Sequence, residues 1–283
     1  MGRKINQSFR KLLRHQGQAK SSIVEKSKED KPDVENLLKQ DREVTRDLIH
    51  ELKAFNERMD SSLNVLLKAL EYKDYETIHN TALSIKALEE LGTCRMELYE
   101  YLISPQSYES MASQGVSIYK EVEKLYKSIN GGWSDQARIF KLTGNSYSRF
   151  KTKRIISVGL FIIIENAWKY SHPEEPIVID FKEANSTLEL TITNWGPIIE
   201  DSEIQQIYQR GYRGSEARKC DEIKGKGLGL DIAKRIFATC DVKFEIIPPN
   251  NKNIKMNGVI RYTPFTVKLI FTPMTQSFVV PLN

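Results

Sequence analysis

Seven apolar residues repeat along one stretch of the chain at the spacing of an α-helix. They follow one another in steps of three or four positions: Leu48, Leu52, Phe55, Met59, Leu63, Leu66 and Leu70. Such steps place all seven side chains on one face of a long helix, as in a helical bundle or a coiled coil. A stripe of this length is too apolar to remain in water, so the helix requires helical partners.

A second helical pattern, roughly residues 76–104, follows the first and stops before Pro105. The short polar link "EYKDYE", residues 71–76, predicts that the two helices form an antiparallel hairpin. Two helices alone leave an apolar seam exposed. We therefore expect two copies of the hairpin to form a dimeric four-helix bundle, which makes the protein a homodimer.

Beyond Pro105 the pattern changes to that of a mixed α/β domain. Residues 116–129 have the periodicity of a helix, whereas "TLELTIT" (187–193) and "TVKLIFT" (266–272) alternate apolar and polar residues like half-buried strands. The expected fold class is therefore α+β. Three further segments have the composition of strands: 136–141, 177–182 and 241–247.

The first forty residues differ in character from the rest of the chain. Six basic residues precede the first acidic residue, Glu25, within a chain whose formal net charge is +5. Four apolar residues at helical spacing accompany them, which would suit an amphipathic helix on a membrane surface or a partner protein; a frayed, solvated leader is the alternative. Residues 20–40 are rich in charged residues and indicate a linker or a loose helix, with order beginning near Asp41.

Other global features limit the class of protein. The sequence contains no apolar run of the roughly 18–20 residues that a membrane span needs, and its first residues lack the apolar block of a signal peptide. The three cysteines, Cys94, Cys220 and Cys240, have no metal-ligand spacing, and their odd number argues against a disulfide framework. These features predict a cytoplasmic protein with reduced thiols.

A glycine-rich stretch, "GKGLGLDIAKRIF" (225–237), precedes a predicted helix. Gly225, Gly227 and Gly229 leave the backbone bare, so that consecutive N–H groups and the helix N-terminus can approach phosphate oxygens. A single glycine-rich turn is weak evidence, because a flexible loop with a tight helix entry looks the same.

Three further motifs concur, and together the four resemble the boxes of the histidine kinase family in the GHKL ATP-binding superfamily. The resemblance covers nearly all of residues 43–273, without an evident sensor domain. Periodicity leaves the β-branched stretch 158–170 undecided between strand and helix, and the resemblance places it on a helix. In chain order the boxes are "ENAWKY" (165–170), "NWGPII" (194–199), "IYQRGYRG" (207–214) and "GKGLGL" (225–230).

The resemblance implies a site for ATP and Mg²⁺. Asn166 would hold the metal, Lys169 would contact the phosphates and Tyr170 would flank the base, which suits the chemistry of an amide oxygen and an ammonium group. Glu165 occupies an acidic position next to the metal ligand, with a catalytic role or a solvent-facing one equally open. The second glycine box would contribute residues 225–230: Gly225, Lys226, Gly227, Leu228, Gly229 and Leu230.

The first glycine box departs from the family pattern. Asn194 stands where an aspartate usually accepts the adenine amino group, and Ile198 replaces the second glycine after Gly196. An amide oxygen can still accept that hydrogen bond, although without the help of a negative charge. We therefore expect ATP binding to persist. The following segment, 208–224, would be a mobile ATP lid containing Arg213.

The motif "HELKAF" (50–55) resembles the phosphoacceptor box, with His50 as the acceptor and Glu51 as its proton partner. His50 lies beside the apolar stripe, so its side chain should face the flank of the bundle. His79 is too close to Asn166 in sequence to fit the family. Ala54 replaces the polar residue that orients water for dephosphorylation in bifunctional relatives, so we expect little phosphatase activity.

These expectations define three domains: a basic tail and linker (1–40), a dimerisation and phosphoacceptor hairpin (41–105) and a GHKL-type α/β sandwich that binds ATP (106–283). The implied function is autophosphorylation of His50 by Mg·ATP, followed by transfer to an aspartate on a response regulator receiver domain. Two alternatives remain open: an ATP-binding scaffold without phosphotransfer, and a GHKL ATPase with Glu165 as base. Nucleic acid is a poor candidate partner, because the basic tail has no interleaved aromatic platform.

Overall fold

In the computed structural model, the described residues are 31–132, 138–219, 227–247 and 253–272. They comprise helices, strands and short 3₁₀ turns, and they divide into two compact units, 1–64 and 65–283. The division falls inside the first described helix, α2 (Lys31–Glu71). The predicted boundaries near residues 40 and 105 separate functional domains and not compact units, so this division does not test them and they stay a prediction. The basic tail and the cysteine Cys220 lie outside the described residues.

Helix α2 begins earlier than the sequence suggested. Residues 31–40 are helical, whereas the charged composition of that stretch indicated a linker or loose helix. Pro32 is compatible with this start, because a proline in the first turn removes only an N–H group that has no partner inside the helix. The 41 residues of α2 include the whole of the apolar stripe.

A tight turn joins α2 to α3 (Tyr75–Ile103). Asp74 caps α3, since its carboxylate accepts hydrogen bonds from the backbone N–H of Thr77 at 3.1 Å and from the Thr77 hydroxyl at 2.7 Å. These bonds lower the pKa of Asp74. The short polar link was therefore predicted correctly. Pro105 then begins the short helix α4 (Pro105–Glu109), because it cannot continue α3.

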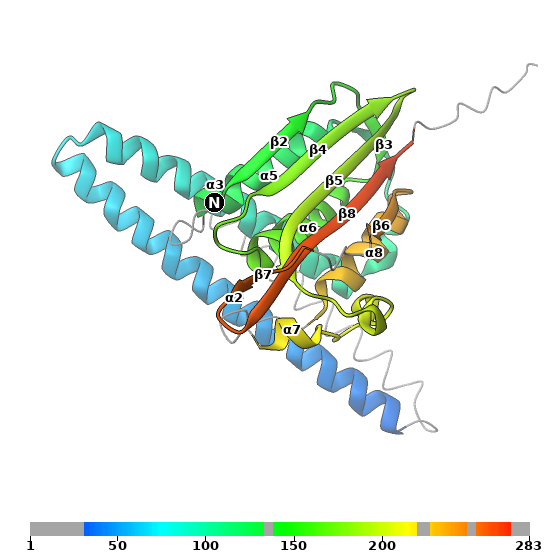
Figure 1. Cartoon of the computed structure of the whole chain (residues 1–283). Coiled ribbons are helices and arrows are strands. Elements are labelled where there is room, and N and C mark those ends of the chain that lie inside the picture. The colour runs from blue at the N-terminus through cyan, green and yellow to red at the C-terminus, as the bar shows by residue number, and fades with distance from the viewer. Residues whose placement is uncertain (1–30, 133–137, 220–226, 248–252, 273–283) are drawn as a thin grey trace, which may run out of the picture. The chain divides into compact units, whose positions relative to one another are not determined.

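The second unit is built around a mixed sheet (Figure 1). The strand order is β2-β4-β5-β8-β6, with β7 paired to β8. Strands β2 and β4 are parallel and the remaining pairs are antiparallel. A separate two-stranded sheet pairs β1 (Gln114–Val116) with β3 (Phe150–Thr152). The strands of the main sheet are β2 (Phe140–Gly144), β4 (Ile177–Ala184), β5 (Thr187–Pro197), β6 (Lys243–Ile247), β7 (Lys255–Asn257) and β8 (Ile260–Phe271).

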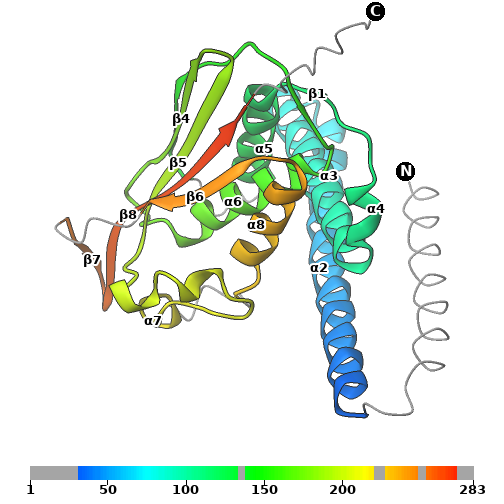
Figure 2. The ribbon, with the colours of Figure 1, turned by 90° about the vertical axis from the view of Figure 1, so that its right-hand side faces the viewer.

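Helices α5 (Ile118–Gly132), α6 (Ile156–Tyr170) and α8 (Gly229–Thr239) cover one face of this sheet (Figure 2). Helix α3 packs on the outer side of this layer, against α5 and α6. Helix α6 is thus enclosed on most sides, which explains why its sequence is apolar nearly all round and has no clear helical stripe. The resemblance to the histidine kinase boxes predicted a helix for residues 158–170, and this prediction is confirmed, whereas periodicity had left the segment undecided.

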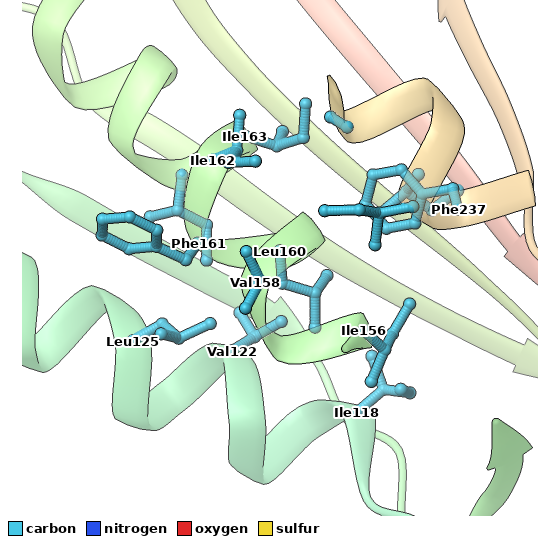
Figure 3. Packing of buried hydrophobic residues seen from close by; sticks show 14 of the residues in the cluster. Ile118, Val122, Leu125, Ile156, Val158, Leu160, Phe161, Ile162, Ile163 and Phe237 are labelled. Atoms are coloured by element: carbon cyan, nitrogen blue, oxygen red, sulfur yellow. The ribbon is translucent and has the colours of Figure 1, made fainter. Parts of the chain in front are cut away.

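The core of the second unit lies between the helices α5, α6 and α8 and the sheet, and Figure 3 shows part of it around these helices. Ile118, Val122 and Leu125 of α5 face α6, and Phe237 of α8 closes the far side. All four side chains are fully buried. Residues of α3 join the same cluster, among them Leu91 and the free, buried thiol of Cys94. The second helix of the predicted hairpin is therefore part of the core that supports the nucleotide-binding motifs.

The expected elements of the α/β part are present with shifted limits. The strand predicted at 136–141 is β2, which begins only at Phe140, and residues 133–137 lie outside the described ones. The predicted helix 116–129 starts two residues later, because Val116 belongs to β1. The segment 249–260, whose role was open, includes β7, which pairs with β8.

Candidate nucleotide-binding site

The second glycine box enters helix α8 in direct contact with the N box. Gly229 is the first residue of α8, and a Cβ atom placed on it would lie 2.9 Å from Nδ2 and 3.3 Å from Oδ1 of Asn166. A larger residue at this position would require the amide of Asn166 to shift. The free N–H groups at the start of α8 consequently lie beside the amide of Asn166, which is half-buried near the end of α6.

Gly227 links the same loop to the lid segment. Its φ angle is +69°, a conformation that residues with a Cβ rarely adopt, and a Cβ atom there would lie 2.3 Å from the carbonyl oxygen of Tyr212. The carbonyl oxygen of Gly227 also accepts a hydrogen bond of 3.0 Å from the backbone N–H of Gly211. Leu228 and Leu230 pack partly buried against the core. Gly225 and Lys226 lie outside the described residues.

Helix α6 presents the charged groups of the N box. Lys169 follows Glu165 by one helical turn, and its Nζ lies 3.1 Å from Oε2 of that carboxylate. The other oxygen of Glu165 pairs with the guanidinium of Arg95, which comes from α3. Glu165 is buried and Lys169 is partly exposed. Tyr170, the last residue of α6, is half-buried.

The first glycine box lies on β5 in a long ladder with β8. Asn194 is buried and is paired in register with Phe265, while Gly196 faces Thr263. A Cβ atom on Gly196 would lie 3.3 Å from Nδ2 of Asn194, so this glycine leaves room beside the amide. The backbone N–H of the buried His172 donates a 2.7 Å hydrogen bond to the carbonyl oxygen of Trp195. The second residue after the N box is thus hydrogen-bonded to the first glycine box.

The described part of the lid segment is held by two carboxylates. Glu216 belongs to the short helix α7 (Ser215–Arg218) and accepts hydrogen bonds from Arg261, the second residue of β8. Glu203 belongs to the turn η2 (Asp201–Glu203) and accepts bonds from the Tyr212 hydroxyl and from the Ser215 backbone. Burial would raise the pKa of both carboxylates, but these hydrogen bonds outweigh it and lower the pKa.

Arg213 lies in the described part of the lid segment. The Nη2 atom of Arg213 donates a 2.9 Å hydrogen bond to the carbonyl oxygen of Ala217, within the lid segment itself. The lid between 220 and 226 lies outside the described residues. The sequence did not point to Glu203, Glu216 or Arg95. No motif contains them, and Arg95 is separated from its partner by 70 positions.

The candidate phosphoacceptor His50 and its expected proton partner Glu51 belong to the first unit. His50 is exposed on α2, and the side chain of Glu51 lies outside the described ones. Ala54 is exposed and Phe55 is half-buried. The nucleotide motifs all belong to the second unit.

These residues fit the groups that the motifs imply. An amide oxygen at Asn166 suits a hard cation such as Mg²⁺, and the helix N-terminus with Lys169 suits phosphate oxygens. Gly229 leaves beside the amide a space that a Cβ atom would fill. Across the described ranges no helix is long and apolar enough to span a membrane, and no cluster of His, Cys, Asp and Glu forms a metal site of its own.

Comparison with known proteins agrees with this geometry. Residues 156–272 match the family model described as histidine kinase-, DNA gyrase B-, and HSP90-like ATPase. The signal transduction histidine-protein kinase ArlS of Staphylococcus epidermidis is 24% identical over 204 residues, which is 72% of this chain and 44% of that protein. Residues 156–272 of the chain therefore form a domain of this ATPase family.

Two further relatives are similar over different lengths. The sensor protein VanSC of Enterococcus gallinarum is 35% identical over 75 residues, or 26% of this chain and 20% of that protein. The solved structure of the Acinetobacter baumannii histidine kinase AdeS covers 80% of this chain and 98% of that chain, with 15% identity and a TM-score of 0.43, too low to support a functional conclusion. The chain spans less than half the length of the ArlS proteins that it matches.

Proposed function

We propose that the chain is an ATP-dependent protein histidine kinase that phosphorylates itself on His50 and passes the phosphoryl group to an aspartate of a response regulator. The contact between Gly229 and Asn166 carries this proposal. It brings the second glycine box and the N box, 63 positions apart in the sequence, into one place with the properties of a phosphate and metal site.

The proposed reaction uses groups on both units. A neutral imidazole nitrogen of His50 attacks the γ-phosphorus of ATP; the new P–N bond forms as the bond to the β-γ bridging oxygen breaks, and ADP leaves. Glu51 accepts or stabilises the proton on the other ring nitrogen. Lys169 and the first N–H groups of α8 neutralise the phosphate oxygens. Mg²⁺ held by Asn166 would withdraw charge from the phosphates.

The base-binding end of the site supports adenine recognition. Asn194 is buried on β5 beside Gly196, so its amide oxygen can accept a hydrogen bond from the adenine amino group in a water-poor setting. The aspartate usual in the family would add charge to this contact. We expect Asn194→Asp to strengthen ATP binding, and Asn194→Leu to weaken it.

A matched pair of histidine variants tests the proposal. The purified chain, His50→Gln and His79→Gln are incubated with Mg²⁺ and γ-labelled ATP, and protein-bound label is scored for lability in acid and stability in alkali. His79 is exposed on α3 and serves as the control. We expect label on the wild type and on His79→Gln only. Label that survives in His50→Gln would exclude His50 as the acceptor.

The same experiment separates the two alternatives. Intact ATP binding without any phosphohistidine would favour the nucleotide-controlled scaffold. Steady phosphate release that survives His50→Gln but not Glu165→Gln would favour an ATPase. The structure gives the ATPase little support, since both oxygens of Glu165 already pair with cations.

We also propose the partners that this reaction requires. The receiver domain of a response regulator would take the phosphoryl group, and a second copy of the chain would cover the apolar stripe of α2. The basic tail lies outside the described residues, so its role rests on the sequence alone. Loss of liposome or partner-protein binding after deletion of residues 1–24 would support a docking role, and unchanged binding would remove it.

A further inference from the structure

The side chain of Glu165 is the centre of an ion-pair network that connects α3 to the N box. Its two carboxylate oxygens have different partners: Arg95 of α3 on one side and Lys169 of α6 on the other. The side chain of Glu165 is only 9% exposed and that of Arg95 only 23%. The guanidinium carbon of Arg95 also lies 5.5 Å from the ring centre of Phe161, which belongs to α6.

The charges of this network determine what Lys169 can do. A buried carboxylate needs a cation, because its charge is costly away from water. If Lys169 were the only cation beside Glu165, the carboxylate and the phosphates would compete for its ammonium group. Arg95 removes this conflict. With Arg95 beside the carboxylate, Lys169 does not have to balance the charge of Glu165 alone.

We propose that Arg95 is a positioning residue for nucleotide binding, which holds the carboxylate of Glu165 so that Lys169 remains available to the phosphates. The inference rests on the proposed function, since it assigns the phosphate-binding role to Lys169. Arg95 itself touches α6 and not the nucleotide. Its position on α3 makes the affinity for ATP dependent on how that helix packs against α6. A displacement of α3 would leave Glu165 to compete for Lys169.

The test compares the binding of ATP and adenosine to variants of the full chain. The variants are made in a His50→Gln background to prevent turnover, and affinities for both ligands are measured by competition with a fluorescent ATP analogue in Mg²⁺. We expect Arg95→Ala to weaken ATP binding about tenfold and to leave adenosine binding unchanged, because adenosine has no phosphates. Arg95→Lys should retain most of the affinity.

Two further variants separate positioning from loss of structure. Arg95→Ala combined with Glu165→Gln removes both charges, so ATP affinity should recover to within about threefold of the reference. Arg154→Ala is the matched control: Arg154 pairs with Glu97 of α3 at 2.7 Å, at the same helix but away from the N box. We expect it to leave ATP affinity unchanged. Arg95→Gln, which keeps the packing over Phe161, replaces Arg95→Ala if the latter does not fold.

Several results would overturn the inference. They are an unchanged ATP affinity in Arg95→Ala, an equal loss for adenosine and ATP, and a double variant that binds ATP no better than the single one. These results leave the proposed function standing. Failure of the reference chain itself to bind ATP would instead overturn the proposed function, and the role of Arg95 with it.

Discussion

Glu216 and Arg261 form a two-point contact across 45 positions of sequence. The backbone N–H of Arg261 donates to Oε1 of Glu216 at 2.8 Å, and its Nη2 donates to Oε2 at 3.0 Å. Lys219 adds a third bond of 2.8 Å. The side chain of Glu216 is only 1% exposed, so these bonds take the place of the water that burial removes from its carboxylate. Helix α7 of the lid segment is thereby fastened to the start of β8.

Glu216→Gln should destabilise the chain by about 2 kcal/mol, less than for a fully buried ion pair because the side chain of Arg261 is 40% exposed. The pKa of Glu216 is lowered from 4.5 to about 2 by the bonds described above, which outweigh burial. The contribution is therefore present above pH 4.5 and is lost as the pH falls toward 2. Urea unfolding of both proteins over this range measures the difference.

Glu245→Gln is the control for this pH series. Glu245 also has a lowered pKa, from a hydrogen bond with Lys243, but its side chain is 40% exposed and that of Lys243 is 65% exposed. Its loss should leave the free energy of unfolding nearly unchanged at every pH, because water screens an exposed ion pair. A constant gap between wild type and Glu216→Gln down to pH 2 would contradict the role of the ionised carboxylate.

Gly229→Ala should disturb the proposed metal site at Asn166 without unfolding the domain. The new methyl group would lie 2.9 Å from Nδ2 of Asn166, so the amide must move away from the start of α8. We expect phosphohistidine formation to slow about a hundredfold, since a displacement of this size at a reacting centre is costly. The rate is measured with labelled ATP at several Mg²⁺ concentrations.

Gly131→Ala provides the comparison for Gly229→Ala. Gly131 is helical too, but its added methyl group would make only an ordinary contact of 3.7 Å with Ala87. Its rate of phosphorylation should equal that of the wild type. Equal rates for all three proteins would show that Asn166 does not depend on the bare backbone at 229.

Gly159→Ala should destabilise the packing of α6 against α8. Its methyl group would lie 3.0 Å from Cγ2 of Ile236 and 3.2 Å from the ring of Phe237, both fully buried. Overpacking costs roughly 1–3 kcal/mol, against a gain of about 1 kcal/mol from better helix propensity. We expect a lower midpoint of urea unfolding. A higher midpoint of urea unfolding would contradict this prediction, because it would show that Ile236 and Phe237 can make room for the methyl group without loss of stability.

Leu70→Glu should break the proposed dimer. Leu70 is 52% exposed on α2. Leu67 on the same helix is 59% exposed, and Leu83 on α3 is 54% exposed. Several exposed leucines of this kind are typical of a protein–protein interface. A symmetric dimer would contain the charge twice, so we expect the dissociation constant to rise a hundredfold or more. Sedimentation velocity measures it. Tyr147→Glu, at a residue 88% exposed elsewhere, should leave the dimer intact.

Local sequence determined the elements and the chemistry of this protein. The alternation at 187–193 and the stripe on α2 are periodic signals, and each corresponds to the predicted strand or helix. The glycines of the second box could also be interpreted from the sequence alone, because a backbone without side chains can approach a phosphate whatever the rest of the fold. Segment limits were less exact. Val116, at the edge of the predicted helix, pairs with Phe150 in a strand that no local pattern indicates.

Tertiary structure alone decided which of these residues work together. Glu165 was recognised within its motif, but the sequence does not show that Arg95, 70 positions earlier, takes one of its oxygens. The same holds for Glu216 and Arg261. A periodic pattern reports only whether a side chain faces the core or the solvent. Partners distant in sequence are chosen by the packing of whole elements, here α3 on α6 and α7 on β8, and this packing leaves no repeating signal in the chain.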